Sequence, residues 1–194
     1  LIQKLELHSS FVLVGHSWGG AIIRAYAGHF PDNVKALIFV EPIDFMQSKE
    51  QADEVYINIG VDPIEADKFH SESLKFMMTQ FNAPKGVIPE IEALDKFYKQ
   101  DLKERKLGPN PNKPMALLLG TKEFDNYPPT PEGFVKPWKD DHQWFKSQIE
   151  NRIKYLSKWP FMFNDCYIII SPNATHHFQV DEPEIVVDMI KKFI

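Results

Sequence analysis

The ten residues FVLVGHSWGG, Phe11 to Gly20, constrain the fold of this chain more than any other stretch. FVLV is a short continuous apolar run, which is typical of a strand buried on both faces of a parallel sheet. Apolar residues then recur at helical spacing from Ala21 to Phe30, and the glycine and proline of GHFPDN end that helix. A second buried strand, ALIFV, follows at Ala36 to Val40. Strand, helix and strand in about thirty residues predict a right-handed βαβ unit and an α/β fold.

The rest of the chain alternates between a helical stretch and a return of this pattern. From 42 to 112 there is no β-rich run, but LKFMMTQF and IEALDKFYKQDL carry apolar residues at helical spacing. MALLLG (115–120) and CYIII (166–170) are two further buried strands, with a helix expected between them and a last helix opening at Pro183. We therefore predict a core in two parts, 1–41 and 113–194, with a helical insertion over 42–112.

Charge and composition restrict the partners. The net charge is −5 and no basic block occurs, so nucleic acid and an anionic membrane surface are not expected partners. No apolar run approaches the ~18 residues of a membrane span. Cys166 is the only cysteine, which excludes an internal disulfide and favours a reducing compartment. We expect a cytoplasmic protein with a small-molecule partner, and the sequence does not indicate its oligomeric state.

The glycines around Ser17 predict a chemical role for this serine. A G-x-S-x-G pattern between a strand and a helix is a nucleophile elbow, a turn so tight that the flanking positions leave no room for a Cβ. Gly15 and Gly19 are expected to meet this need, and Gly20 to let the helix pack close to the strand. The backbone N–H of Trp18, at the helix N-terminus, would then point to where a tetrahedral oxyanion forms.

Serine becomes a strong nucleophile only when a base takes its proton, so a histidine is needed at the same end of the sheet. His176 and His177 alone sit in a loop directly after a buried strand, at the carboxyl end where active sites of open α/β folds gather. The other histidines are expected at the far end of the sheet, on helices, or pointing away from Ser17: His8, His29, His70, His142 and His16.

The GHSWGG elbow, the helical insertion after the next strand and HHFQVDEPEIVVDMI together resemble the α/β-hydrolase superfamily, over essentially the whole chain. In many members the catalytic histidine stands seven residues before a proline that opens the last helix, a spacing that His176 meets with Pro183. The resemblance therefore implies His176 as the base, and His177 is interpreted as its partly buried neighbour.

The acid that orients the base has three candidates. Members usually place it in a G-x-x-[DE] loop, where GTKEFD offers Glu123 and, close by, Asp125. A minority place it directly after the strand that follows the nucleophile, where IFVEP offers Glu41. Glu41 is preferred, because a carboxylate that follows four apolar residues is costly without a partner. Glu123 and then Asp125 remain the alternatives.

The resemblance also limits the chemistry. Related epoxide hydrolases and dehalogenases carry aspartate at the elbow, whereas Ser17 implies an acyl-enzyme and cleavage of an ester or similar acyl compound. No cofactor or metal is expected, and 42–112 would be a lid over an apolar acyl pocket. The alternatives are a C–C bond hydrolase or peptidase of the same fold, and a non-catalytic binding protein.

The family's earlier strands and its HG loop, which donates a second oxyanion N–H, are missing before the elbow. We therefore expect a partial fold here, with further sequence before Leu1 in the intact protein.

Overall fold

The computed structural model describes most of the chain and divides it into two compact units. Unit 1 comprises Leu1–Phe45, Lys106–Lys122 and Leu156–Ile194, and unit 2 comprises Met46–Arg105 and Glu123–Tyr155. The described residues are 10–43, 47–80, 89, 92–93, 107–123, 130, 133–163 and 165–194.

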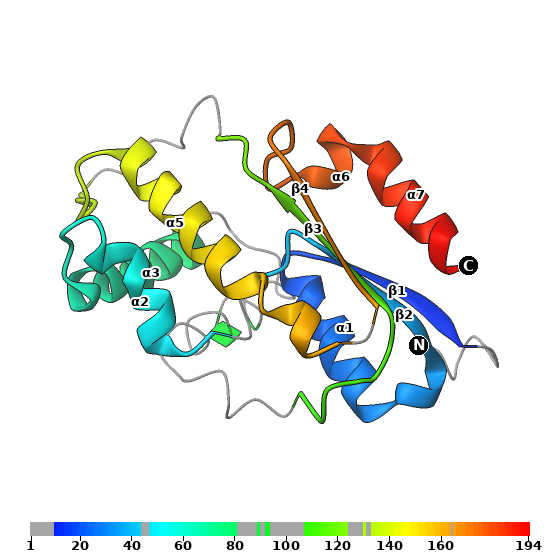
Figure 1. Cartoon of the computed structure of the whole chain (residues 1–194). Helices are drawn as coiled ribbons and strands as arrows, with labels where there is room; N and C mark the ends of the chain where they lie inside the picture. Colours follow the sequence, from blue (N-terminus) through cyan, green and yellow to red (C-terminus); the bar gives the residue numbers. More distant parts are fainter. Residues whose placement is uncertain are drawn as a thin grey trace. The chain divides into compact units, whose positions relative to one another are not determined.

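Unit 1 is built on a four-stranded sheet in the order β1-β2-β3-β4 (Figure 1). The strands are β1 (Phe11–His16), β2 (Val34–Val40), β3 (Met115–Gly120) and β4 (Cys166–Ser171). Every neighbouring pair is parallel. Each strand coincides with one of the apolar runs. For β2 and β3, which are buried at nearly every position, the reason is that a strand covered on both faces needs no polar alternation. The predicted α/β class, a parallel sheet flanked by helices, is confirmed.

Helices cover both faces of this sheet. They are α1 (Trp18–His29), α6 (Phe178–Asp181) and α7 (Pro183–Phe193), together with the short 3-10 turns η2 (Pro31–Asn33) and η4 (Trp159–Phe161). On one face, Ile38 and its neighbours on β2 and β3 pack against Phe178 of α6 and Phe193 of α7. On the other face, the ring of Phe39 meets that of Trp159 edge-on at 5.1 Å. Alternate residues of β2 thus face opposite helical layers.

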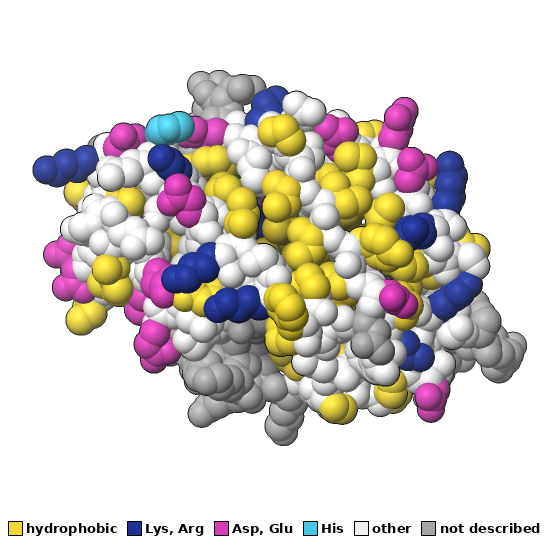
Figure 2. Space-filling model, viewed as in Figure 1, with side chains coloured by type: hydrophobic (Ala, Val, Ile, Leu, Met, Phe, Trp, Pro, Cys, Tyr) yellow, Lys and Arg dark blue, Asp and Glu magenta, His cyan; other side chains and the backbone are white. Residues whose placement is uncertain are grey.

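The strand β4 is less completely covered than β2 and β3. Tyr167 and Ile170 of β4 and Val187 of α7 are partly exposed. Figure 2 shows hydrophobic side chains gathered over this part of unit 1. Among the described strands, β4 stands at the end of the order and has a neighbour on one side only, which agrees with its partial exposure.

Unit 2 is helical. Its described helices include α2 (Lys49–Ile57), α3 (Pro63–Gln80) and α5 (Asp141–Leu156), the last of which ends in unit 1. The side chain of Ser48 accepts a hydrogen bond from the backbone N–H of Gln51, and the side-chain oxygen of Gln51 accepts one from the backbone N–H of Ser48, which makes a capping box at the start of α2. No helix in the described part of the chain is long and apolar enough to cross a membrane.

The helix α5 joins α2 through buried polar side chains. Ser147 donates to the carbonyl of Val55 at 2.8 Å, and Asn151 donates to that of Gln51 at 2.8 Å. In the compact units, 123–155 groups with the helical stretch after β2. The three segments inferred from the sequence stay a prediction. Most of the helix expected over 91–102 lies outside the described residues.

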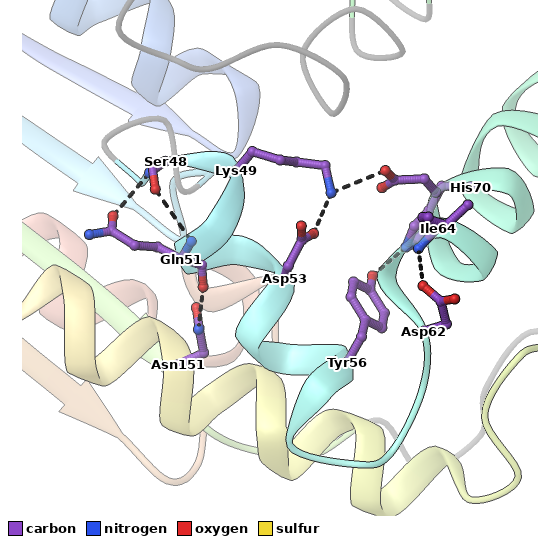
Figure 3. A network of polar contacts seen from close by, with 10 residues as sticks. Ser48, Lys49, Gln51, Asp53, Tyr56, Asp62, Ile64, His70 and Asn151 are labelled. Atoms are coloured by element: carbon purple, nitrogen blue, oxygen red, sulfur yellow. Dashed lines mark hydrogen bonds and ion pairs between the residues drawn. The ribbon is translucent and has the colours of Figure 1, made fainter.

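A polar network joins α2 to α3 (Figure 3). Lys49 forms ion pairs with Asp53 and, at 3.0 Å, with Asp67. The Tyr56 hydroxyl hydrogen-bonds Nε2 of His70, whose ring also meets that of Trp138. Burial in this aromatic surrounding lowers the pKa of His70, so the neutral imidazole is favoured in the folded state.

Candidate active site

Ser17 occupies a strained turn between β1 and α1. Its backbone has φ 54° and ψ −121°, a conformation that residues with a side chain rarely adopt. Its N–H donates to the carbonyl of Val40 on β2 at 3.0 Å, which fixes the turn to the end of the neighbouring strand. Its side chain does not cap the helix that it precedes. Such backbone strain clusters at functional sites.

Two of the three elbow glycines are required by close contacts. A Cβ at Gly15 would lie 2.5 Å from the carbonyl oxygen of Gly19, and a Cβ at Gly20 would lie 2.7 Å from Cβ of Pro42. At Gly19, however, an added Cβ would meet nothing within 4 Å among the described residues. Among the described residues, the expectation that Gly19 leaves no room for a Cβ is therefore wrong.

Glu41 takes the matching place on the neighbouring strand. The register pairs His16 with Val40, so Ser17 and Glu41 are the next residues along two adjacent parallel strands. Glu41 also has a positive φ, 46°, and it is 2% exposed. Its Oε1 accepts a hydrogen bond from the backbone N–H of Gly120, at the end of β3. This contact and the pair with a histidine offset part of the cost of burying a carboxylate.

That histidine is His176, in the loop after β4. Its Nδ1 lies 3.4 Å from Oε2 of Glu41. A carboxylate can only accept, so Nδ1 carries the proton of the neutral ring and Nε2 is left as the basic atom. The ring is partly open to solvent, with 39% of the side chain exposed.

Gly120 lets the loop that carries His176 approach the sheet. A Cβ at Gly120 would stand 2.2 Å from the carbonyl oxygen of Ala174 and 2.6 Å from that of Thr175. The carbonyl of Ala174 accepts from the N–H of Lys122 at 3.0 Å, which ties the loop to the end of β3. Gly120 was not among the residues predicted from the sequence, although a glycine directly after the apolar run MALLL was a signal that could have found it.

The other candidates have different surroundings. Glu123 accepts a hydrogen bond from Nδ1 of His142 within unit 2. His177 is exposed, and its backbone N–H donates to Oγ1 of Thr175 at 3.1 Å. Asp125 and His8 lie outside the described residues. Of the two acid candidates that the structure describes, Glu41 is therefore the one that contacts His176, whereas Glu123 pairs with His142.

Trp18 is the first residue of α1, so its N–H belongs to a helix N-terminus, where peptide dipoles favour negative charge. Its role in an oxyanion hole stays a prediction.

Burial raises the pKa of the Cys166 thiol to about 11, which disfavours the reactive thiolate at neutral pH. Among the side chains that the structure describes, no group of three or more His, Cys, Asp or Glu could hold a metal ion.

Residues 3–160 match the model of the family described as alpha/beta hydrolase fold. The chain belongs to this family. The family resemblance inferred from the sequence is therefore confirmed, and membership of the alpha/beta hydrolase fold family supports a hydrolase.

Solved structures agree at the level of the fold. A probable hydrolytic enzyme from Pseudomonas aeruginosa PAO1 is 17% identical with a TM-score of 0.50, and the match covers 100% of this chain and 65% of that one. A point mutant of an epoxide hydrolase from Bacillus megaterium is 14% identical with a TM-score of 0.53, and the match covers 99% of this chain and 71% of that one. At these identities the likeness concerns the alpha/beta hydrolase fold alone.

One curated relative matches a short part of the chain. A probable 1-acylglycerol-3-phosphate O-acyltransferase from Oryza sativa subsp. japonica is 38% identical over 52 residues, which are 27% of this chain and 13% of that protein. The chain thus matches only a small part of the length of this relative, and it spans 65% of the Pseudomonas structure.

Proposed function

We propose that this chain carries the catalytic centre of a serine hydrolase that cleaves a carboxylic ester or a similar acyl compound. The observation that supports this most is the pairing of His176 Nδ1 with the buried carboxylate of Glu41, which directly follows β2 as Ser17 directly follows the neighbouring β1. A nucleophile, a base and an orienting acid at the carboxyl ends of strands in one parallel sheet are the parts that acyl transfer to serine requires.

In the proposed reaction Ser17 Oγ attacks the acyl carbon while Nε2 of His176 takes the hydroxyl proton. The oxyanion that forms is stabilised by the N–H of Trp18 at the start of α1. The imidazolium then protonates the leaving alkoxide, and the acyl group stays on Ser17 as an ester. Water attacks this ester, His176 takes the proton from the water, and the acid leaves as Ser17 regains its proton.

Glu41 has an electrostatic task in this scheme. Its buried carboxylate holds Nδ1–H of His176 in one tautomer and stabilises the imidazolium that forms in each half-reaction. The Gly120 N–H fixes one oxygen of that carboxylate and leaves the other directed at the ring. The role of the helical segment as a lid over an acyl pocket stays a prediction from the sequence.

A second candidate function is acyl transfer to an alcohol instead of to water. The 38% identity to a probable 1-acylglycerol-3-phosphate O-acyltransferase over 52 residues favours it. The same acyl-enzyme would serve, because a hydroxyl group of an acceptor can replace the attacking water. Exclusion of water from the acyl-enzyme would then decide between the two outcomes.

The test uses the full natural protein. A fluorophosphonate probe should label the wild type and not Ser17→Ala, and p-nitrophenyl esters of increasing acyl length should be hydrolysed by the wild type alone. A 1-acylglycerol-3-phosphate acceptor, added with the ester, separates the two functions: an acyltransferase diverts the acyl group from free acid to the acceptor. Labelling of Ser17→Ala at the wild-type rate, in folded protein, would show that Ser17 is not the nucleophile.

A further inference from the structure

His16, the residue before Ser17, reaches the loop of the proposed base. Its Nε2 lies 2.7 Å from the backbone carbonyl oxygen of His176, 160 positions later in the sequence. A carbonyl oxygen only accepts hydrogen bonds, so Nε2 of His16 must carry a proton and donate it. The two imidazole rings also lie together, with centroids 4.8 Å apart and planes at 46°. From the sequence, His16 was expected only to point away from Ser17.

The base needs such an anchor because its link to Glu41 is long. At 3.4 Å, the Nδ1 contact is near the outer limit of a hydrogen bond, and the His176 side chain is 39% exposed. The preceding loop residue, Thr175, has its own anchor, because its backbone N–H and its hydroxyl donate to the Asp181 carboxylate at 2.7 and 2.6 Å. The bond from His16 ties the backbone of His176 itself to the strand of the nucleophile.

We propose that His16 is a positioning residue for the reaction, which holds His176 at a fixed distance from Ser17. This inference rests on the proposed function. His16 ends β1 and Ser17 follows it directly, so movement of the nucleophile turn carries His16 and, through its hydrogen bond, the backbone of the base. Glu41 orients the ring of His176 from β2, whereas His16 holds the backbone of His176 from β1.

The N–H donor, rather than the bulk of the ring, is the feature that the proposal requires. Gln at position 16 can present its amide N–H close to the place of Nε2, whereas Asn is one methylene shorter and Phe has no donor. His16→Gln should therefore retain function that His16→Asn and His16→Phe lose. His29, an exposed histidine at the end of α1, gives the matched control His29→Gln.

The experiment measures ester hydrolysis by the full natural protein and these variants, with thermal unfolding of each. We expect kcat of His16→Phe and His16→Asn to fall by about 10- to 100-fold with KM nearly unchanged, because a displacement of ~1 Å costs about 100-fold. His16→Gln should recover most of kcat, and His29→Gln should stay within about twofold of the wild type. The rate of fluorophosphonate labelling at Ser17 should follow kcat.

Two results would overturn the inference. One is a kcat within about twofold of the wild type for folded His16→Asn or His16→Phe. The other is an equal loss in His16→Gln and His16→Asn, which would assign the effect to the imidazole ring rather than to the hydrogen bond. If His16→Phe does not fold, the Gln and Asn pair decides alone. Failure of the proposed function is seen separately, as full activity in Ser17→Ala and His176→Gln.

Discussion

Replacement of Gly120 by alanine would test whether the close approach of the His176 loop is needed for activity. The added Cβ would lie 2.2 Å from the carbonyl oxygen of Ala174 and 2.6 Å from that of Thr175, whereas real Cβ contacts under 3.0 Å essentially never occur. Both atoms are backbone, so no side chain can rotate away. The loop must therefore move outward by about 1 Å, since close-packed interiors have no space to absorb the overlap.

That movement should weaken catalysis more than folding. His176 stands directly after Thr175, so it moves with the loop, while Ser17 and Glu41 stay at the ends of β1 and β2. A displacement of about 1 Å in a catalytic group costs on the order of 100-fold in rate, and overpacking costs about 1–3 kcal/mol of stability. We expect kcat for a p-nitrophenyl ester to fall about 100-fold with KM little changed. Kinetics are measured well below the melting temperature, which is recorded by circular dichroism.

Gly19→Ala is the matched control, because the same methyl group would meet no described atom within 4 Å there. It should hydrolyse the ester at close to the wild-type rate. A folded Gly120→Ala variant with wild-type kcat would refute the reasoning, because it would show that His176 tolerates the displacement or that the loop relaxes without moving it.

Three other perturbations have defined outcomes. Gly15→Ala places its Cβ 2.5 Å from the Gly19 carbonyl oxygen, so fluorophosphonate labelling of Ser17 should be lost and the melting temperature lowered; unchanged labelling would contradict the elbow geometry. Glu41→Gln removes the charge beside His176 and should lower kcat by about 100- to 10,000-fold, whereas Glu123→Gln should keep it; the reverse order, measured with one ester, would move the acid to Glu123. Burial lowers the pKa of His70, so the unfolded chain takes up the proton first on acidification, and the free energy of unfolding should fall as the pH drops below about 6.5. Urea titrations between about pH 5 and 8 should show this slope reduced in His70→Gln, and an equal slope in both proteins would assign it to other groups.

The sheet could be read from the sequence because its strands are continuous apolar runs. Two strands, Val34–Val40 and Met115–Gly120, are buried on both faces, so nearly every position in them is apolar. The first residue of α1 was harder to predict from the sequence. The helix begins at Trp18, before the predicted Ala21, because the contacts of the elbow overcome the weak helix propensity of two glycines.

The grouping of α5 with the helical unit could not be predicted from periodicity. Apolar spacing identifies a buried face but not the element that covers it. The partners are specified here by Ser147 and Asn151, which are polar and buried and donate to the backbone of α2. A pattern of hydrophobic residues carries no information on such polar contacts. The sequence therefore assigned this helix to the core segment 113–194, because it lies between two strands.

The candidate acid shows most clearly what a sequence can and cannot decide. Glu41 could be shortlisted because a carboxylate after four apolar residues needs a partner, but its partner depends on strand register. Successive side chains of a strand alternate between faces, so a shift of β2 by one residue would turn Glu41 away from Ser17 and from the loop after β4. The pairing of His16 with Val40 and of Val40 with Leu118 prevents this and brings the Glu41 carboxylate to the N–H of Gly120. Because these pairings are set by the packing of the whole sheet, the Glu41–His176 contact is a property of the tertiary structure rather than of any local motif.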